Sequence, residues 1–286
     1  MPETSSRGPH MLNEIYSVFS VAGETVIYKI LPITIVMGLV FAILTHWSAC
    51  NPGQVWWRKR EIVTDVLYWF IIPLLARFVR IGLMVTGAAY IYGIHTADAL
   101  MALFDDGFGP LAQLPHWAQG LVFLVVSDFL LYWFHRFYHG ATMWKYHAVH
   151  HSSTEVDWIS AARFHPINIL FGTVLVDAAL LLAGISPNVM LWVGPFSTFT
   201  SAFVHANLNW TLGPFKYVLA GPVFHRWHHT APDRGGNMNF AGTFPIWDIL
   251  FGTWYMPKGE LPDAYGVDDK NFPEGFGAQM LYPFRQ

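Results

Sequence analysis

Long runs without a charged residue are the dominant pattern of this chain. No Asp, Glu, Lys or Arg occurs between Lys29 and Arg58, and the apolar segment LPITIVMGLVFAILTHW starts at Leu31. A largely apolar stretch at 114–134, with Asp128 as its one charged residue, contains WAQGLVFLVVSDFLLYWF. A helix of about 20 apolar residues crosses the hydrocarbon of a bilayer. Both runs are therefore predicted to be membrane-spanning helices.

A further span is predicted within 65–95, although this stretch is too long for one straight crossing. Pro73, Arg77 and Arg80 interrupt its apolar pattern. We expect a tilted or kinked helix whose arginines snorkel toward the interface or face protein.

The pattern after residue 165 predicts a helical hairpin over 166–212. INILFGTVLV precedes Asp177, and no further charge occurs before Lys216. A turn is expected near Ser186-Pro187-Asn188 because these residue types favour turns. The chain is therefore predicted to be an all-α integral membrane bundle of about four to five spans.

Composition agrees with a membrane location. Of the 286 residues 53% are hydrophobic and 12% are charged, whereas soluble domains carry about 25% charged residues. Aromatic residues reach 17%, which fits interfacial belts. A soluble enzyme with an unusually large core is the disfavoured alternative. The net charge of −3 gives no reason to expect nucleic-acid binding, and the single Cys50 excludes an internal disulfide.

Basic residues predict the topology. The loop at 58–60 reads Arg-Lys-Arg, whereas the connection at 96–113 carries three aspartates and no Lys or Arg. The positive-inside rule puts the basic loop in the cytoplasm and the acidic one outside. No cleavable signal sequence is expected in MPETSSRGPH. We divide the chain into an N-terminal transmembrane region, 1–113, and a catalytic region, 114–286, with a cytoplasmic histidine-rich helical cap.

Histidines supply the candidate chemistry, since 14 of them accompany one cysteine. Helix positions i, i+3 and i+4 share a face, so each cluster can aim its imidazoles in one direction. Neutral imidazole suits iron, zinc, copper or nickel. Eight such ligands are too many for one ion, so two metals are predicted. The three clusters, all on the cytoplasmic side in this topology, are His135 and His139; His147, His150 and His151; His225, His228 and His229.

Alternative roles for these histidine clusters fit the sequence less well. Two copies of HxxHH are not expected by chance, and a histidine tract for metal buffering would be low-complexity and loop-borne. A membrane haem protein does not need two such triads, and a zinc protease would need HExxH. A histidine-lined metal transporter, the more distant alternative, would place its ligands at the bilayer midplane.

The segment SDFLLYWFHRFYHGATMWKYHAVHHSSTEVDWISAARFHP, followed by HANLN and HRWHHTAPDRGGNMNFAGTFPIWDILFGT, resembles the fatty acid hydroxylase/sterol desaturase superfamily over about 127–254. Its members are membrane proteins that bind two irons through histidines and use O2 and two electrons to hydroxylate or desaturate lipids. The resemblance implies that the eight clustered histidines are metal ligands.

His205 is the expected ninth ligand. Relatives often carry another histidine four residues on, where this chain has Asn209. Asn209 or Asn207 is expected to hold a metal-bound water or to leave a coordination position open; capping the helix end is an equal alternative. His165, in RFHP, is expected to support a ligand or to start a helix rather than bind metal.

Two carboxylates are candidates for orienting the ligands. Asp128 lies in an apolar span, two helical turns before His135, and Asp248 lies in WDILFGT. A carboxylate that accepts an imidazole N–H fixes the ring; for Asp248, a helix or turn cap is the nearly equal alternative. The histidines outside the clusters are not expected to be ligands: His10, His46, His95 and His116.

The resemblance implies two bound Fe ions, although zinc can replace them in purified samples because imidazole sites hold zinc more tightly. Haem, flavin or NAD bound by this chain is not expected. The expected activity is hydroxylation of a sterol, fatty acyl or alkylglycerol lipid, with desaturation as the alternative. The lipid is expected to reach the metals past Trp158, Phe164 and Phe203.

Electrons are expected from a separate donor, a b-type cytochrome or a ferredoxin with its reductase. Four basic residues are candidates for its docking face, with ordinary positive-inside placement as the alternative: Arg136, Lys145, Arg226 and Arg234.

Overall fold

The computed structural model describes residues 20–106 and 109–285, without the side chains at 97, 104–106 and 191. Throughout these residues the regular structure is helical, with no strand, so the predicted all-α class is confirmed. Three helices are long and apolar enough to cross a membrane, at Ser20–Ser48, Ile62–Tyr92 and His116–Tyr138. By contacts the chain divides into Met1–Ile43 and Leu44–Gln286.

The first unit holds a π-helical turn, Val26–Ile30, and most of α2, Leu31–Ser48. Many of its large apolar side chains are exposed, among them Val36 and Leu39. An apolar helix that leaves such side chains uncovered matches lipid better than water.

The second unit begins with the end of α2 and continues through a short 3-10 turn, Trp56–Arg58, into α3, Ile62–Tyr92. The predicted second span is thus one continuous helix that includes Pro73. At about 1.5 Å per residue it is roughly 46 Å long, which exceeds the hydrocarbon thickness and requires tilt. Arg80 faces protein, as expected, and pairs with Asp177 at 2.6 Å.

Beyond α4, Ala97–Asp106, the chain forms α5, His116–Tyr138, and α6, Ala141–His151. The hairpin follows a 3-10 turn at Trp158–Ala162. Its first arm consists of α7 (Pro166–Ile169), a π-helical turn (Leu170–Val174) and α8 (Leu175–Leu182). Its second arm is α9 (Pro187–His205). Ser186 caps α9 by accepting the N–H of Asn188, and Pro187 occupies the first helical position. The turn therefore lies where the sequence predicted it.

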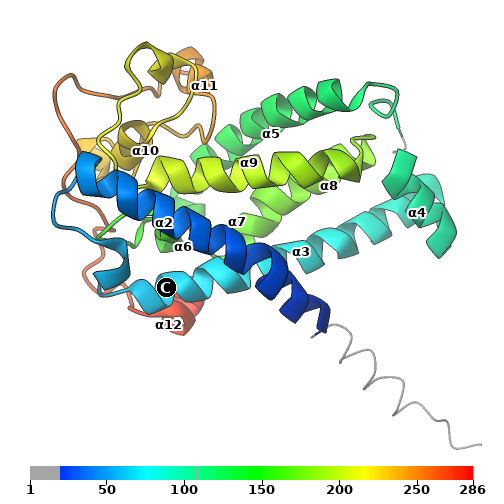
Figure 1. The fold of residues 1–286 in the computed structure, drawn as a ribbon, viewed down its shortest axis with the longest axis horizontal. Helices are drawn as coiled ribbons and strands as arrows, with labels where there is room; N and C mark the ends of the chain where they lie inside the picture. The colour runs from blue at the N-terminus through cyan, green and yellow to red at the C-terminus, as the bar shows by residue number, and fades with distance from the viewer. Residues whose placement is uncertain (1–19, 107–108, 286) are drawn as a thin grey trace, which may run out of the picture. The chain divides into compact units, whose positions relative to one another are not determined.

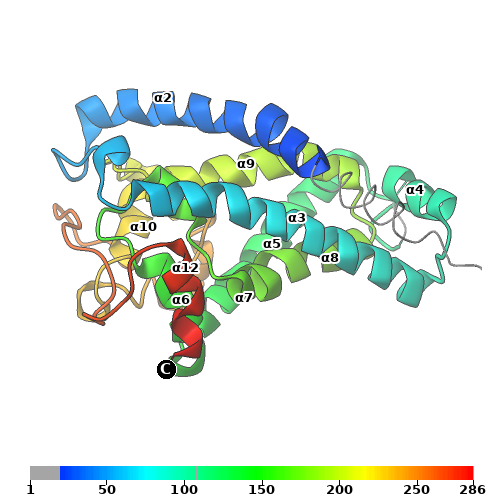
Figure 2. The same ribbon diagram turned by 90° about the horizontal axis from the view of Figure 1, so that it is seen from below.

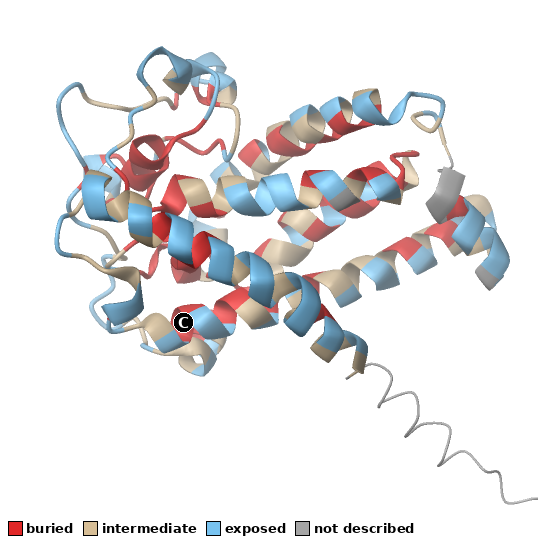
Figure 3. Cartoon of the chain, viewed as in Figure 1, coloured by how far each residue is buried: buried red, intermediate tan, exposed pale blue. Residues whose placement is uncertain are grey.

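The C-terminal third consists of short helices joined by loops: α10 at Pro222–His228, α11 at Ile246–Leu250 and α12 at Phe276–Leu281. Three 3-10 turns lie among them, Gly213–Tyr217, Pro232–Arg234 and Tyr282–Phe284. Every residue of α10 is buried, whereas α5, α8 and α9 show exposed residues along their lengths (Figure 3).

Within this unit the long helices separate two ends. Figures 1 and 2 place α6, α10 and α12 at one end of α3, α5, α8 and α9, and α4 at the other. At the α4 end, Leu111 donates its N–H to the carbonyl of Ala183 in the hairpin turn. The histidine-bearing elements therefore lie together at one end of the helices, and the acidic connection lies at the opposite end.

Candidate metal centre

Four helix ends carry the nine candidate ligands. The last turn of α5 and its cap supply His135 and His139, and the last residue of α9 is His205. The remaining six histidines lie on α6 and on α10 with its cap. Because the carriers end or pack at the same place, all nine imidazoles converge there.

The nine side chains form two groups. In each, the candidate ligand atoms lie within 4.8 Å of one another. The five-histidine group consists of His135, His139, His147, His151 and His228. The four-histidine group consists of His150, His205, His225 and His229. The groups adjoin, since the rings of His151 and His229 stack with centroids 4.6 Å apart.

The four-histidine group is the tighter of the two. The Nε2 atom of His205 lies 3.2 Å from those of His150 and His225, and 3.1 Å from that of His229. The Nε2 atoms of His225 and His229 are themselves 3.2 Å apart. Four nitrogens around one ion at about 2.0 Å in a tetrahedron lie roughly 3.3 Å apart. The spacing therefore suits one first-row metal ion.

In the five-histidine group, the Nε2 atoms of all five rings are buried and have no hydrogen-bond partner among the described residues. Buried polar atoms are rarely left without a partner. Ligands on opposite sides of a five-coordinate ion lie roughly 4.2 Å apart, close to the 4.8 Å limit of the group. Small ring rotations thus suffice for all five to bind a single ion.

Backbone carbonyls orient four of the rings. The Nδ1 atom of His135 lies 2.7 Å from the carbonyl oxygen of Phe240, and that of His228 lies 2.7 Å from Met238. His150 and His205 make the same contact with Arg163 and Ser201. A carbonyl oxygen only accepts, so each Nδ1 carries the proton and leaves a lone pair on Nε2. That is the tautomer a metal ligand requires.

Burial favours the neutral imidazoles in the centre. Desolvation lowers the pKa of the histidines on α6 and α10 well below its ordinary value, and neighbouring histidines lower it further. Burial likewise lowers the pKa of His139 to about 3. Neutral imidazole is the form that binds metal, so no proton has to leave before an ion enters at neutral pH.

Two asparagines that sequence reasoning missed contact the centre. The Oδ1 atom of Asn237 lies 3.1 Å from Nδ1 of His139, and the amide of Asn168 lies 3.3 Å from Nδ1 of His147. Exchanging the amide O and N of Asn168 would let its Oδ1 accept the Nδ1–H of His147, which leaves Nε2 of that ring free for a metal. Nothing in the sequence around them, RFHPIN for Asn168 and RGGNMN for Asn237, indicates that these residues contact histidine ligands.

A buried charge network lies behind His150. Arg163, whose carbonyl orients that ring, is fully buried. Its guanidinium donates to Asp65, to Glu61 at 3.1 Å and to Ser152 at 3.2 Å. Lys59 pairs with the same Asp65 carboxylate. The network links the start of α3 to the segment between α6 and α7. In the sequence, the only indication of it is the position of Asp65 among apolar residues.

The predicted carboxylates act on loop backbone rather than directly on a ring. Asp128 accepts the N–H groups of Thr243 and Phe244 at 2.9 Å and the indole N–H of Trp247 at 3.0 Å. Asp248 accepts the N–H groups of Phe240 and Ala241. Since the carbonyl of Phe240 binds His135, Asp248 supports that ligand through one peptide unit.

The other predicted polar residues take structural positions. His165 starts α7, where its Nδ1 accepts the N–H of Ile167. The amide of Asn207 bonds to the backbone of Asn51 and Gln54, so it is not free to hold a water at the metals. Asn209 is exposed. Neither asparagine side chain contacts the histidine groups within the described chain.

The histidines expected not to bind metal lie apart. His46, His95 and His116 are exposed and belong to neither group, and His10 lies outside the described residues.

Two surface expectations need correction. Arg226 is fully buried and donates to the carbonyls of Val156 and His205, so it cannot belong to a docking face. Trp158 is also fully buried and packs against Trp56 and Trp69, so it does not line an open path. Both side chains are buried because they contact several segments that surround the histidines.

Comparison with known proteins agrees with this site. The fatty acid hydroxylase family profile matches residues 120–253. Ornithine lipid hydroxylase OlsE of Rhizobium tropici is 30% identical over 85% of this chain and 72% of its own length. Alkylglycerol monooxygenase of Xenopus tropicalis is 35% identical over 55% of this chain, which covers 35% of that protein.

A very-long-chain aldehyde decarbonylase of Oryza sativa is 34% identical over 51% of this chain, which covers 57% of that protein. No solved structure matches. The matched segment contains all nine histidines of the two groups. On this sequence similarity the chain belongs to the fatty acid hydroxylase family.

Proposed function

We propose that this protein is a membrane-bound di-iron oxygenase that hydroxylates a C–H bond of a lipid. The observation that carries the proposal is the division of nine converging imidazoles into one group of five and one of four. Two adjoining sites of this kind fit two metal ions, and their unequal ligand numbers leave the four-coordinate ion with room for another ligand. When bound, the two ions would activate O2 with two electrons from a donor.

The chain itself fixes and shields the site. Carbonyls of Phe240, Met238 and Arg163 hold ring orientations, so little rearrangement accompanies metal binding. Seven of the nine ligands are buried, and the other two are half-buried. Exclusion of water protects a reactive centre from side reactions.

The position of Phe164 beside the four-histidine group favours a substrate with a hydrocarbon chain. Its ring stacks on His150 with centroids 4.2 Å apart and an interplanar angle of 10°. Phe203, from the predicted access path, packs with Phe224 next to His225. These apolar rings give an alkyl chain a surface near the ions.

The relatives' names guide the choice of substrate. One acts by its name on ornithine lipid and another on alkylglycerol. We propose a membrane lipid of these kinds or a related fatty acyl lipid or sterol. Desaturation at the same site is the alternative outcome. A metal transporter is disfavoured because the histidines lie at helix ends rather than midway along the spans.

The proposed topology places the centre on the cytoplasmic side, where a separate cytochrome or ferredoxin supplies electrons. Arg136 and Arg234 are exposed and Lys145 is half-buried, so these three remain candidates for donor docking. Arg234 also pairs with Asp263 at 2.8 Å, in an exposed contact that a partner can displace.

Lipid mass spectrometry of cells with and without the gene tests the activity. We expect lipids that gain one oxygen atom when the protein is present, and no gain with His150→Ala. His95→Ala, at an exposed histidine outside both groups, is the matched control and should retain the product. A product that survives His150→Ala would refute the assignment, and loss of two hydrogens instead would establish desaturation.

A further inference from the structure

Two short segments of the C-terminal third expose apolar side chains away from the long helices. In the turn Gly213–Tyr217 and the residues after it, Phe215 is 66% and Val218 59% exposed; in α11, Leu250 is 63% exposed. Contiguous apolar surface of this kind marks an interaction site. The segments meet at a shallow hollow lined by residues of both, including Tyr217 and Ile249.

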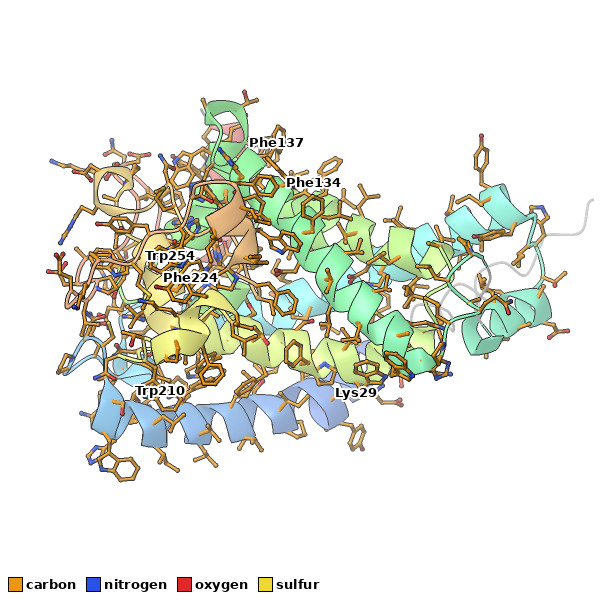
Figure 4. The ribbon with its side chains drawn as sticks, turned by 90° about the horizontal axis from the view of Figure 1, so that it is seen from above. Lys29, Phe134, Phe137, Trp210, Phe224 and Trp254 are labelled. Atoms are coloured by element: carbon orange, nitrogen blue, oxygen red, sulfur yellow. The ribbon has the colours of Figure 1, made fainter. Side chains whose placement is uncertain are left out.

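The depth of α11 along α5 indicates what covers this surface. Trp247 packs on Phe129 with centroids 4.9 Å apart, and Phe251 packs on Trp133 at 4.8 Å. Phe129 lies nine residues before the end of α5 at Tyr138, which is roughly 13 Å along the helix. α11 therefore lies beside the span, not beyond its end. In Figure 4, the orange ribbon of α11 lies between α5 and the labelled Trp254.

The membrane interface on α5 is marked by its own side chains. Trp133 is 41% exposed, and the guanidinium of Arg136 lies 5.6 Å above its ring. An aromatic ring beside a cation is typical of the headgroup level. Phe129 is one turn deeper, about 6 Å, so the contact with Trp247 falls within the outer part of the hydrocarbon.

The loop before α11 has the internal hydrogen bonding that such a location demands. Within hydrocarbon, backbone N–H groups outside long helices need partners from the protein. Asp128, on the span itself and 5% exposed, accepts the N–H groups of Thr243 and Phe244 and the indole of Trp247. A carboxylate inside a span is costly; here it accepts three hydrogen bonds from this loop and from Trp247.

We infer that residues 213–219 and 246–251 form an embedded face, which lies in the bilayer beside α5 and is covered by lipid acyl chains. Exposed apolar side chains of α5, such as Val125 and Trp133, continue the same surface. Lys216 lies 5.1 Å from the ring of Tyr217 and 5.4 Å from that of Trp254. Its stem covers apolar surface while its amine reaches the headgroups. The catalytic region is thereby fixed to one leaflet independently of its reaction.

Site-directed spin labelling of the full chain in phosphatidylcholine vesicles tests the embedded face. Cys50→Ser removes the one native cysteine. Leu250→Cys and Phe215→Cys then report on the face, and Val125→Cys on α5 is the lipid reference. Leu261→Cys is the matched control, because Leu261 is an exposed leucine in a loop between Glu260 and Pro262.

Labels at Leu250 and Phe215 should be relaxed strongly by O2 and weakly by a water-soluble nickel chelate, as at Val125. The label at Leu261 should show the opposite order. Nickel accessibility at Leu250 equal to that at Leu261 would place the face in water and overturn the inference. Low accessibility to both reagents would also overturn it, since a second copy or another protein would then cover the face.

Discussion

Removing His205 separates the two metal sites, because this residue belongs to only one of them. Its Nε2 atom lies 3.1–3.2 Å from the other three nitrogens of the four-histidine group. His205→Ala leaves three imidazoles there and leaves all five in the other group. We therefore expect a protein that keeps one ion per chain and loses the second.

The size of the loss follows from the geometry. Loss of a residue that merely orients a ligand costs about 10–100-fold in metal affinity. His205 supplies one of four direct contacts, so its removal should cost at least about 100-fold, or ~2.7 kcal/mol. Since His205 is only 3% exposed, water is a poor substitute within the unaltered packing.

Elemental analysis after loading with ferrous iron under anaerobic conditions measures the outcome, and product formation is followed on the same samples. Wild type should bind two ions per chain and form product. His205→Ala should bind one ion per chain and form no product. Replacing both His147 and His228 by alanine leaves three imidazoles in the five-histidine group and should lose the other ion, and adding His205→Ala to these two changes should lose both ions. His95→Ala should match wild type. Two tightly bound ions in His205→Ala, with activity retained, would refute the division into two sites.

Three further predictions concern the support of the centre. Asp248→Ala leaves the backbone N–H groups of Phe240 and Ala241 without their acceptor, whereas the hydroxyl of Thr253 keeps Tyr132 as a partner. At about 1–3 kcal/mol for each N–H group, unfolding in detergent should require roughly 2–6 kcal/mol less, and an unchanged melting temperature would contradict the assigned role. Arg163→Met leaves Glu61 without its ion-pair partner and Asp65 with Lys59 alone, and it should destabilise the fold by about 3 kcal/mol; wild-type thermal stability would argue against the network. Chelation of the metal should lower the melting temperature of wild type, because an ion that binds only the folded state stabilises it. An equal shift in the variant that lacks His147, His205 and His228 would show that the chelator acts elsewhere.

The membrane-spanning helices could be predicted from the sequence because contact with lipid requires apolar side chains along the whole span. A span needs a long and mainly apolar run, so α3 and α5 were predicted within a few residues of their bounds, and the hairpin turn was predicted at Ser186. A single helix containing Pro73 was expected and is found. The sequence left open whether that helix is tilted or kinked, because neighbouring contacts decide how a proline bends a helix.

The histidine spacings likewise predicted the eight clustered residues, since positions i, i+3 and i+4 of a helix share a face. His205, outside these clusters, was added with the family resemblance. The division of the nine histidines into five and four was not readable. Neighbours on α6 belong to different groups, with His147 and His151 in one and His150 in the other. Only the packing of α9 and α10 against α6 assigns them.

The sequence by itself determined that this is a helical membrane protein with converging imidazoles, because both properties follow from local periodicity. The tertiary structure decided which group each imidazole joins, which carbonyl orients it and where the carboxylates act. Asp128 and Asp248 both looked like partners of histidines, yet both bind the backbone of the loop at 240–244. Such choices depend on which loops and helix ends meet, over separations from 7 residues for Asp248 and Ala241 to 116 for Asp128 and Phe244, and they leave no pattern in a single chain.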